Sequence, residues 1–229
     1  MTVGVSEEEA AAIPLFKGLN ADELTTVCGL LHTKTFATNT AVLTMHQKGS
    51  SVYFIRYGTV KICSEGRFGN TVIIAIVGAG DILGEIHTVD GLGHSADVVT
   101  LEKVSVFWMD SEEFHTCRRT MWTLDENLMR MLAQRARFTT ARLHVLATSS
   151  MRGRLASQLL AFASGAGVPA VDGVLIPLNL TQLDLASLIG ASRQHVNSIL
   201  QNFKEQRYIS TNAQNRIIIH NSQALERCE

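Results

Sequence analysis

The feature that most constrains the fold is a long stretch, between Asp110 and Ser150, that contains neither proline nor glycine. It predicts a helix that continues to about Ala147, and a helix of this length usually belongs to a coiled coil or a dimer. One seam within it is spaced four, three, four, three and four residues apart: Leu128, Leu132, Arg135, Thr139, Arg142 and Leu146. Its ends are leucine and its middle is polar. Either a neighbouring face carries the packing and these residues are exposed, or the polar middle has a function.

The segments on either side of this helix differ in character. Residues 6–32 read as short helices, with Asn20 as an N-cap and Glu23 three residues later. From Thr35 to about Asp110, β-rich runs alternate with Gly, Ser and Asn, which favours an antiparallel roll or barrel. After a hinge at 148–150 come a helix, a short hairpin, two helices around a tight turn and the strand RIIIH. We therefore expect an α+β chain with a β-roll at 1–110, a long helix at 111–148 and a second domain at 149–229.

Composition excludes several classes of protein. Apolar residues make up 46% and charged residues 18% of the chain, as in ordinary globular proteins, and the net charge of −1 means that any basic footprint must be local. The four cysteines are scattered, without the spacing of a zinc or iron–sulfur site. There is no apolar run of membrane-spanning length, and the start MTVGVSEEEA lacks the layout of a signal peptide. We expect no metal, no membrane association and a cytoplasmic location.

The most specific motif lies at 180–209. Thr181 and Asp184 fit a capping box that opens a short helix, and Gly190 ends it. Ser192 then caps a second helix, whose apolar positions are Val196, Ile199, Leu200 and Phe203 and whose opposite face carries Arg193, Gln194, Asn197 and Gln201. Arg pairs with guanine, and Gln or Asn with adenine, in the major groove. The layout predicts a helix-turn-helix followed by a wing; the alternative is a plain helical hairpin with a solvated polar face.

LTQLDLASLIGASRQHVNSIL resembles the winged helix-turn-helix of the Crp/Fnr superfamily of bacterial transcription regulators. VYFIRYGTVKIC and GAGDILGE resemble that family's cyclic-nucleotide-binding β-roll, and the likeness runs in order from about Leu15 to Asn221. It implies a homodimer through residues 111–147 that binds a palindromic operator in double-stranded DNA, with RNA polymerase as a further candidate partner. By the same resemblance, Thr181 and Ser192 touch phosphates and Arg193 reads guanine. Gln194 and Ser198 depart from the cyclic-AMP receptor, which has a glutamate and a second arginine there.

The resemblance also assigns a ligand site. The stretch GEIHTVDGLGHSADV is similar to the phosphate-binding cassette of cyclic-AMP-binding members, and it keeps Gly84, Glu85, Ser95 and Ala96. Glu85 would take the ribose hydroxyl, and Arg135 would pair with Glu85. Thr139 and Thr140 fall where the receptor meets adenine. A cyclic nucleotide such as cAMP is therefore the implied ligand.

His94 replaces the arginine that binds the cyclic phosphate in the family. A neutral imidazole loses charge assistance, at a cost on the order of 1–3 kcal/mol, or roughly ten- to hundred-fold in affinity. Three readings follow: weak or pH-dependent cAMP binding, a different ligand in the same pocket, or a regulator whose roll needs no ligand.

Other sensor types and enzymes fit less well. The iron–sulfur regulators carry an N-terminal cysteine cluster, and this chain has only Cys28 there; haem sensors use a histidine near the cassette, and His87 is near but not in register. There is no GxSxG, P-loop or HExxH motif, so we expect no enzyme. A nucleotide sensor without DNA binding is disfavoured by the polar face of the second helix.

Overall fold

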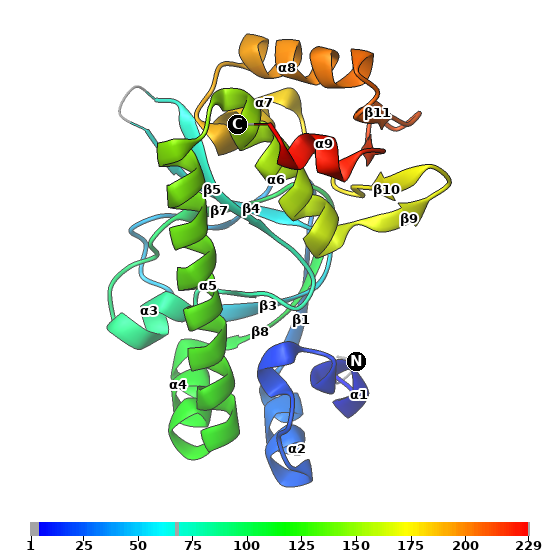
Figure 1. Cartoon of the computed structure of the whole chain (residues 1–229). Helices are drawn as coiled ribbons and strands as arrows, with labels where there is room; N and C mark the ends of the chain where they lie inside the picture. The colour runs from blue at the N-terminus through cyan, green and yellow to red at the C-terminus, as the bar shows by residue number, and fades with distance from the viewer. Residues whose placement is uncertain (1–4, 67–68, 229) are drawn as a thin grey trace. The chain divides into compact units, whose positions relative to one another are not determined.

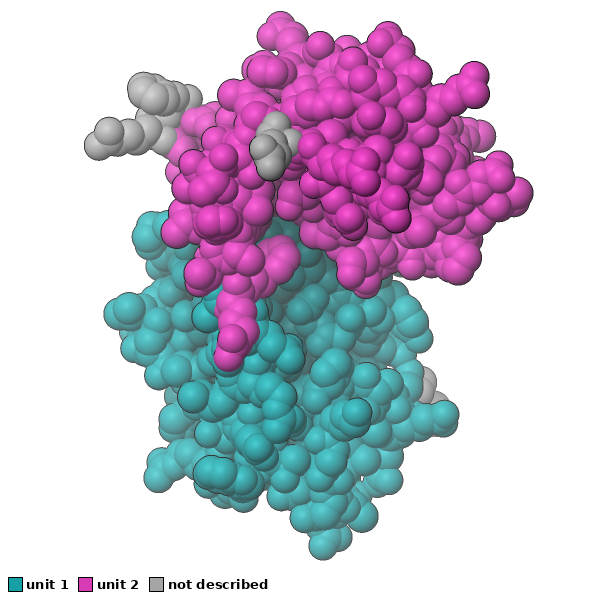
Figure 2. All heavy atoms as spheres, viewed as in Figure 1, with its two compact units in different colours: residues 1–64, 74–136 teal, residues 65–73, 137–229 magenta. Residues whose placement is uncertain are grey.

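The structure is a computed structural model that describes residues 5–66 and 69–228; the first four residues of the acidic N-terminal segment lie outside this part. The chain forms two compact units (Figure 2). Unit 1 contains residues up to Ser64 and from Ile74 to Ala136, and unit 2 contains residues 65–73 and everything from Arg137 onwards.

In the part of the chain that the structure describes, eight strands between residues 32 and 110 form two four-stranded antiparallel sheets; several of them are labelled in Figure 1. The strands are β1 (His32–Phe36), β2 (Ala41–Leu43), β3 (Ser51–Tyr57), β4 (Val60–Glu65), β5 (Thr71–Val77), β6 (Ile82–Leu83), β7 (Asp97–Thr100) and β8 (Val104–Asp110). Their orders are β1-β8-β3-β6 and β2-β7-β4-β5. The predicted antiparallel β-roll is confirmed.

Apolar clusters among the described residues hold unit 1 together. Inside the roll, buried residues of several strands meet, including Ile55, Val98 and Val106. Another cluster includes Phe54 and Phe107, which pack with buried residues from the helices of the unit. The rings of Phe16 and Phe54 lie 4.9 Å apart. Alternation along β3 explains this arrangement, because successive side chains of a strand point to opposite faces.

Short helices precede the roll: α1 (Glu7–Ala11), the 3₁₀ turn η1 (Pro14–Phe16) and α2 (Ala21–Leu30). The predicted cap is confirmed, because Asn20 Oδ1 accepts from the Glu23 N–H at 2.9 Å and the Glu23 carboxylate accepts from the Asn20 N–H at 2.9 Å. Asn127, which lies much later in the chain on α5, holds this N-terminal region in place. Its Nδ2 donates to the carbonyls of Leu15 at 2.9 Å and Lys17 at 2.8 Å.

The single helix predicted from about 111 to 147 is wrong, because the structure has two: α4 (Ser111–Thr120) and α5 (Trp122–Thr148). Met121 separates them with an extended backbone, at φ −112° and ψ 93°. Its side chain is buried in the unit 1 core, so tertiary packing breaks the helix without help from proline or glycine.

The leucines and arginines of the predicted seam on α5 contact their own chain. Leu128 is fully buried and Leu132 packs against the same cluster. Arg135 binds Glu85 in unit 1, and Arg142 binds backbone carbonyls in unit 2. The arginines in the middle of the seam are therefore neither exposed nor part of a leucine packing seam.

The described part of unit 2 contains the C-terminal end of α5, further helices and a small antiparallel sheet of order β11-β12-β10-β9. Its elements after α5 are α6 (Met151–Ala166), β9 (Val168–Ala170), β10 (Gly173–Leu175), α7 (Gln182–Ile189), α8 (Arg193–Glu205), β11 (Ile209–Thr211), β12 (Ile217–Ile219) and α9 (Ser222–Glu226). The predicted hairpin and closing strand are present, whereas α9 was not predicted. Gly173 is required where the strands meet, because a Cβ there would lie 2.1 Å from the Ile219 carbonyl oxygen. None of the described helices is long and apolar enough to cross a membrane.

Candidate nucleic-acid interface and ligand site

Helices α7 and α8 form the predicted helix-turn-helix. The Thr181 hydroxyl accepts from the Asp184 N–H at 3.0 Å and the Ser192 hydroxyl accepts from the His195 N–H at 3.2 Å, so both predicted N-caps are observed. Gly190 ends α7 in the left-handed conformation, at φ 68°. Such a residue is the usual helix stop, because glycine has no Cβ to clash.

The outer face of α8 is polar and exposed. Its buried, apolar face consists of Val196, Ile199, Leu200 and Phe203. The opposite side exposes the predicted Arg193, Gln194, Ser198 and Gln201, and also His195, which the sequence reasoning missed. The sequence could have indicated His195, because it lies three residues before Ser198 on the polar side of the same periodic pattern.

Two of the predicted contact residues also have partners inside the motif. The Thr181 hydroxyl donates to Asp184 Oδ2 at 2.6 Å, so its observed role is to cap α7. Asn197 is half-buried and its Oδ1 accepts from Gln182 Nε2 at 2.9 Å, which ties the two helices together. Neither bond is a base or phosphate contact, and the DNA roles of both residues stay predictions.

Charge is distributed unevenly along the chain. Residues 137–229 contain nine Lys and Arg against five Asp and Glu, although the whole chain has a net charge of −1. The basic footprint needed for contact with phosphates is therefore local to the part that carries the helix-turn-helix.

The cassette of unit 1 begins at Gly84, whose φ is 84°. A Cβ at this position would lie 2.9 Å from the Ser51 carbonyl oxygen, so both the conformation and the space require glycine. Gly84 precedes the short helix α3 (Glu85–Asp90), which was not predicted because six residues carry too little periodicity.

Glu85 and Arg135 form the central ion pair of the cassette. Glu85 is 2% exposed and its Oε1 accepts from Arg135 Nη1, while Arg135 Nη2 donates to the Ile82 carbonyl at 2.8 Å. Burial raises the pKa of Glu85 above its ordinary value, and the Arg135 guanidinium opposes that rise. Burial likewise raises the pKa of Asp81, whose Oδ1 lies 4.0 Å from Arg135. The pairing implied by the family resemblance is thus present.

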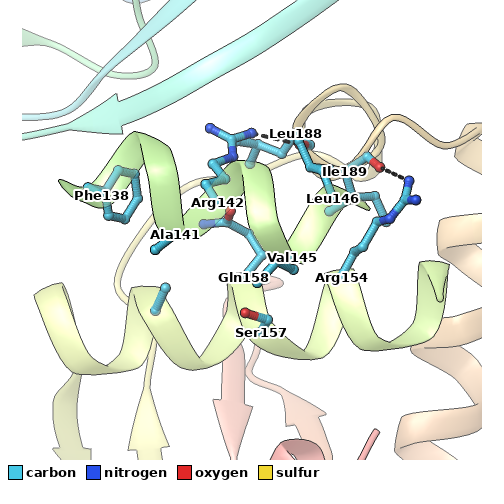
Figure 3. Close-up of a pocket in the computed structure, with 11 residues that line it drawn as sticks. Phe138, Ala141, Arg142, Val145, Leu146, Arg154, Ser157, Gln158, Leu188 and Ile189 are labelled. Carbon is cyan, nitrogen blue, oxygen red and sulfur yellow. Dashed lines mark hydrogen bonds between the residues drawn. The ribbon is translucent and has the colours of Figure 1, made fainter. Parts of the chain in front are cut away.

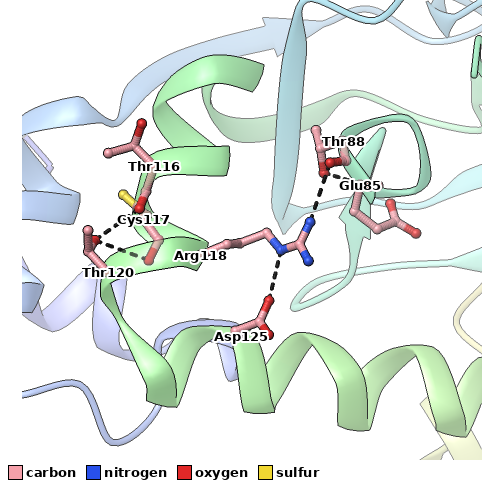
Figure 4. Close-up of polar contacts among 7 residues, drawn as sticks. All are labelled: Glu85, Thr88, Thr116, Cys117, Arg118, Thr120 and Asp125. Carbon is pink, nitrogen blue, oxygen red and sulfur yellow. Dashed lines mark hydrogen bonds and ion pairs between the residues drawn. The ribbon is translucent and has the colours of Figure 1, made fainter. Parts of the chain in front are cut away.

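Arg118 was missed by sequence reasoning and fixes the end of α3 (Figure 4). Its Nε donates to Asp125 at 2.9 Å and its Nη1 donates to the Thr88 carbonyl at 3.3 Å. Thr88 in turn donates its hydroxyl to the Glu85 carbonyl at 2.6 Å. These bonds connect α3 to α4 and α5 and hold the cassette helix that carries Glu85.

His94 lies inside the cassette and is only 8% exposed. Its ring centroid is 6.0 Å from that of His87, and a Cβ at Gly49 would come within 2.6 Å of His94 and 2.9 Å of His87. Burial, and then His87, lower the pKa of His94. The imidazole that replaces the family arginine is therefore neutral near pH ~7 in this structure.

The other predicted ligand residues lie in the cassette and on α5. Ser95 is exposed and Ala96 is buried beside His94 in the chain. Thr139 and Thr140 are exposed on α5 and belong to unit 2. Their contact with a ligand stays a prediction.

The described residues contain no group of three or more His, Cys, Asp or Glu side chains that could hold a metal ion. Among the cysteines, Cys63 and Cys117 are buried, whereas Cys28 and Cys228 are half-buried. Burial raises the pKa of Cys28 and of Cys117, so neither thiol is activated as a nucleophile.

Comparison with known families agrees with both halves. The cyclic nucleotide-binding domain matches residues 33–120, and the Crp-like helix-turn-helix domain matches residues 153–228. The chain belongs to the Crp/Fnr family of transcription regulators, which bind DNA and are not enzymes.

Individual relatives span nearly the whole chain. A CRP-like cAMP-activated global transcriptional regulator of Mycobacterium tuberculosis is 28% identical over 96% of this chain and 98% of its own length. A global nitrogen regulator of Nostoc is 26% identical over 85% of this chain and 87% of its own. The structure of FixK2 from Bradyrhizobium japonicum matches with a TM-score of 0.78 at 16% identity, over 87% of this chain and 97% of that one, which supports the fold.

Proposed function

We propose that this transcription regulator is a homodimer whose DNA binding is controlled by a cyclic nucleotide in the β-roll. The observation that carries the ligand proposal is the buried Glu85 carboxylate, held by Arg135 directly after the left-handed Gly84. A buried carboxylate is costly to retain unless it is paired or has a function. The Mycobacterium tuberculosis relative is named as cAMP-activated, which favours cAMP as the first ligand to test.

The residues present fit one end of such a ligand better than the other. Glu85 accepts from Arg135 through Oε1, and a carboxylate has further lone pairs with which to accept a ribose hydroxyl. At the phosphate end, His94 and Ser95 would donate, but His94 is neutral and brings no fixed charge. A cyclic phosphate favours imidazolium, so binding would take up a proton and strengthen as the pH falls.

The test is isothermal titration of the purified protein with cAMP and with cGMP at about pH 6 and about pH 8. Glu85→Gln keeps the size of the side chain and serves as the matched variant. We expect tighter cAMP binding at the lower pH and a roughly ten-fold or greater loss in the variant. Absence of heat with both nucleotides at both pH values would refute the ligand proposal and leave an effector-independent regulator, the alternative favoured by a neutral His94.

The dimer is proposed to form along an exposed stripe of α5. The stripe repeats every seven residues and consists of Trp122, Met129, Ala136 and Leu143. Its large side chains are exposed: Trp122 by 78%, Met129 by 60% and Leu143 by 66%. Four residues after each member of this stripe lies another exposed residue: Glu126, Ala133, Thr140 and Ala147. A seven-residue apolar repeat is the pattern by which two copies of a helix pack together, and a second copy of this chain is therefore the expected occupant.

Light scattering of Leu143→Asp tests the stripe, with Gln134→Asp, an exposed change at an outer heptad position, as control. We expect the first variant to be monomeric and the second to remain dimeric. Equal dimerisation of both would move the interface elsewhere.

On DNA, the dimer would place two copies of α8 about 34 Å apart in successive major grooves of a palindromic operator, where RNA polymerase is the expected further partner. Arg193→Ala, assayed by fluorescence anisotropy on a duplex selected with the wild type, should weaken binding roughly ten-fold or more. Unchanged affinity would remove Arg193 from the base-reading residues.

A further inference from the structure

The C-terminal end of α7 has an unusual set of partners. The last carbonyl oxygens of a helix receive no hydrogen bond from N–H groups of the same helix, so they need donors from elsewhere. The N–H groups of Gly190 and Ala191 both bond to the Ala186 carbonyl, so the carbonyls of the last three residues, Leu188 and Ile189 among them, receive no bond from these two groups. Two arginines face these oxygens (Figure 3).

Arg142 from α5 is the main donor. Its Nη2 donates to the Leu188 carbonyl at 2.7 Å and to the Ile73 carbonyl at 2.9 Å, so one nitrogen joins α7 to the first half of β5 within unit 2. Burial lowers the pKa of the Arg142 guanidinium from its ordinary value, but arginine stays charged in proteins. A half-buried positive charge at a helix C-terminus also interacts favourably with the helix dipole.

Arg154 from α6 approaches the neighbouring carbonyl. Its Nη1 lies 3.5 Å from the Ile189 carbonyl oxygen, and its Nε donates to the Ser149 carbonyl at 3.1 Å. Ser149 is the residue that follows α5. Both arginines border a groove of about 150 Å³ that is otherwise lined mainly by apolar side chains, among them Phe138, Val145 and Leu146.

We infer that Arg142 and Arg154 are positioning residues for DNA reading, because they hold the end of α7 from which the recognition helix starts. Only Gly190, Ala191 and Ser192 separate α7 from Arg193 at the beginning of α8. The Gln182–Asn197 hydrogen bond ties the two helices along their length. A shift at the end of α7 therefore moves the first turn of α8, whose residues face the bases in a helix-turn-helix. This inference rests on the DNA-binding function of the family and is independent of the proposed ligand and dimer stripe.

The test compares Arg142→Met with Arg137→Met. Arg137 is exposed on the same helix, so both variants lose one positive charge from α5. Methionine keeps the apolar contacts of the arginine stem but donates no hydrogen bond. Arg142→Lys adds a variant that retains the charge and lacks the planar fork of donors.

Fluorescence anisotropy measures the affinity of each variant for a duplex selected in vitro with the wild type and for a scrambled duplex of equal length. We expect Arg142→Met to bind the selected duplex roughly ten- to hundred-fold more weakly, Arg142→Lys to lie in between, and Arg137→Met to change by less than about three-fold. Affinity for the scrambled duplex should be the same in Arg142→Met and Arg137→Met, because non-specific binding depends on charge.

Hydrogen exchange separates positioning from general stability. We expect Arg142→Met to increase exchange of the α7 amides while those of β9 and β10 in the same unit stay as protected as in the wild type. Equal affinities of Arg142→Met and Arg137→Met for the selected duplex would overturn the inference. Uniform loss of protection throughout unit 2 would overturn it as well, because Arg142 would then serve only the fold.

Discussion

The Glu85–Arg135 pair permits a quantitative prediction for Arg135→Met. Removing one partner of a buried ion pair costs about 3–5 kcal/mol, because the remaining charge is left unpaired. Arg135 is 29% exposed, so water can reach Glu85 after the substitution, and we expect a loss of about 3 kcal/mol in the free energy of unfolding of unit 1.

The loss should depend on pH in a defined direction. Burial already raises the pKa of Glu85, and removal of Arg135 takes away the group that opposes this rise. A carboxyl whose folded pKa lies above its unfolded value stabilises the fold below the unfolded pKa, and this contribution is lost as the pH rises through the folded pKa. The destabilisation by Arg135→Met should therefore be smaller near pH ~5 than near pH ~8, with a limiting slope of about 1.4 kcal/mol per pH unit.

Urea unfolding followed by tryptophan fluorescence measures this effect in the right unit, because both tryptophans, Trp108 and Trp122, belong to unit 1. The protein concentration must be held fixed, since association is linked to stability. The double variant Glu85→Gln/Arg135→Met should recover about 2 kcal/mol at the higher pH and lose the pH dependence. If the single variant lost less than about 1 kcal/mol, or if Glu85→Gln failed to rescue it, the pairing argument would be refuted.

Three further outcomes can be checked by unfolding measurements. His94 has a lowered pKa in the folded state, so its contribution to stability should be complete above about pH 6.5 and decline below it; this decline should be absent in His94→Gln and present in His144→Gln, a change at an exposed histidine. Asn127→Asp replaces the donor to two carbonyls with a carboxylate and should cost about 3 kcal/mol, seen as an earlier fluorescence transition in urea; a change below about 1 kcal/mol would contradict the observed hydrogen bonds. Thr181→Ala should cost about 1 kcal/mol in thermal unfolding followed by circular dichroism, and Thr181→Ser should restore it if the residue is a cap.

Periodicity and capping predicted much of this fold because they are local. The caps at Asn20, Thr181 and Ser192 and the buried face of α8 depend on residues within one or two turns of each other. The break at Met121 could not be predicted in this way, since it is imposed by burial of its side chain in a core assembled from distant segments.

The candidate sites show the same division. Residue types and spacing predicted the exposed Arg193 and Gln194, and family resemblance predicted the Glu85–Arg135 pair. The partners of Arg142 are backbone carbonyls at residues 73 and 188. Because every residue has the same carbonyl group, no pattern of side chains in the sequence could have predicted which carbonyls Arg142 binds. The lowered pKa of His94 likewise depends on tertiary structure, because its causes are burial and the nearby His87.

The membership of residues 65–73 in unit 2 bears on how this regulator can be divided or exchanged. A fragment that begins at Arg137 would lack Ile73, whose side chain is only 1% exposed and whose carbonyl accepts from Arg142. The complementary fragment would carry Ile73 without Arg142, the donor to its carbonyl. Swapping DNA-binding halves between relatives at the long helix would consequently combine the α7 of the donor protein with the β5 of the recipient. A working chimaera should need the first residues of β5 to be transplanted together with the C-terminal half.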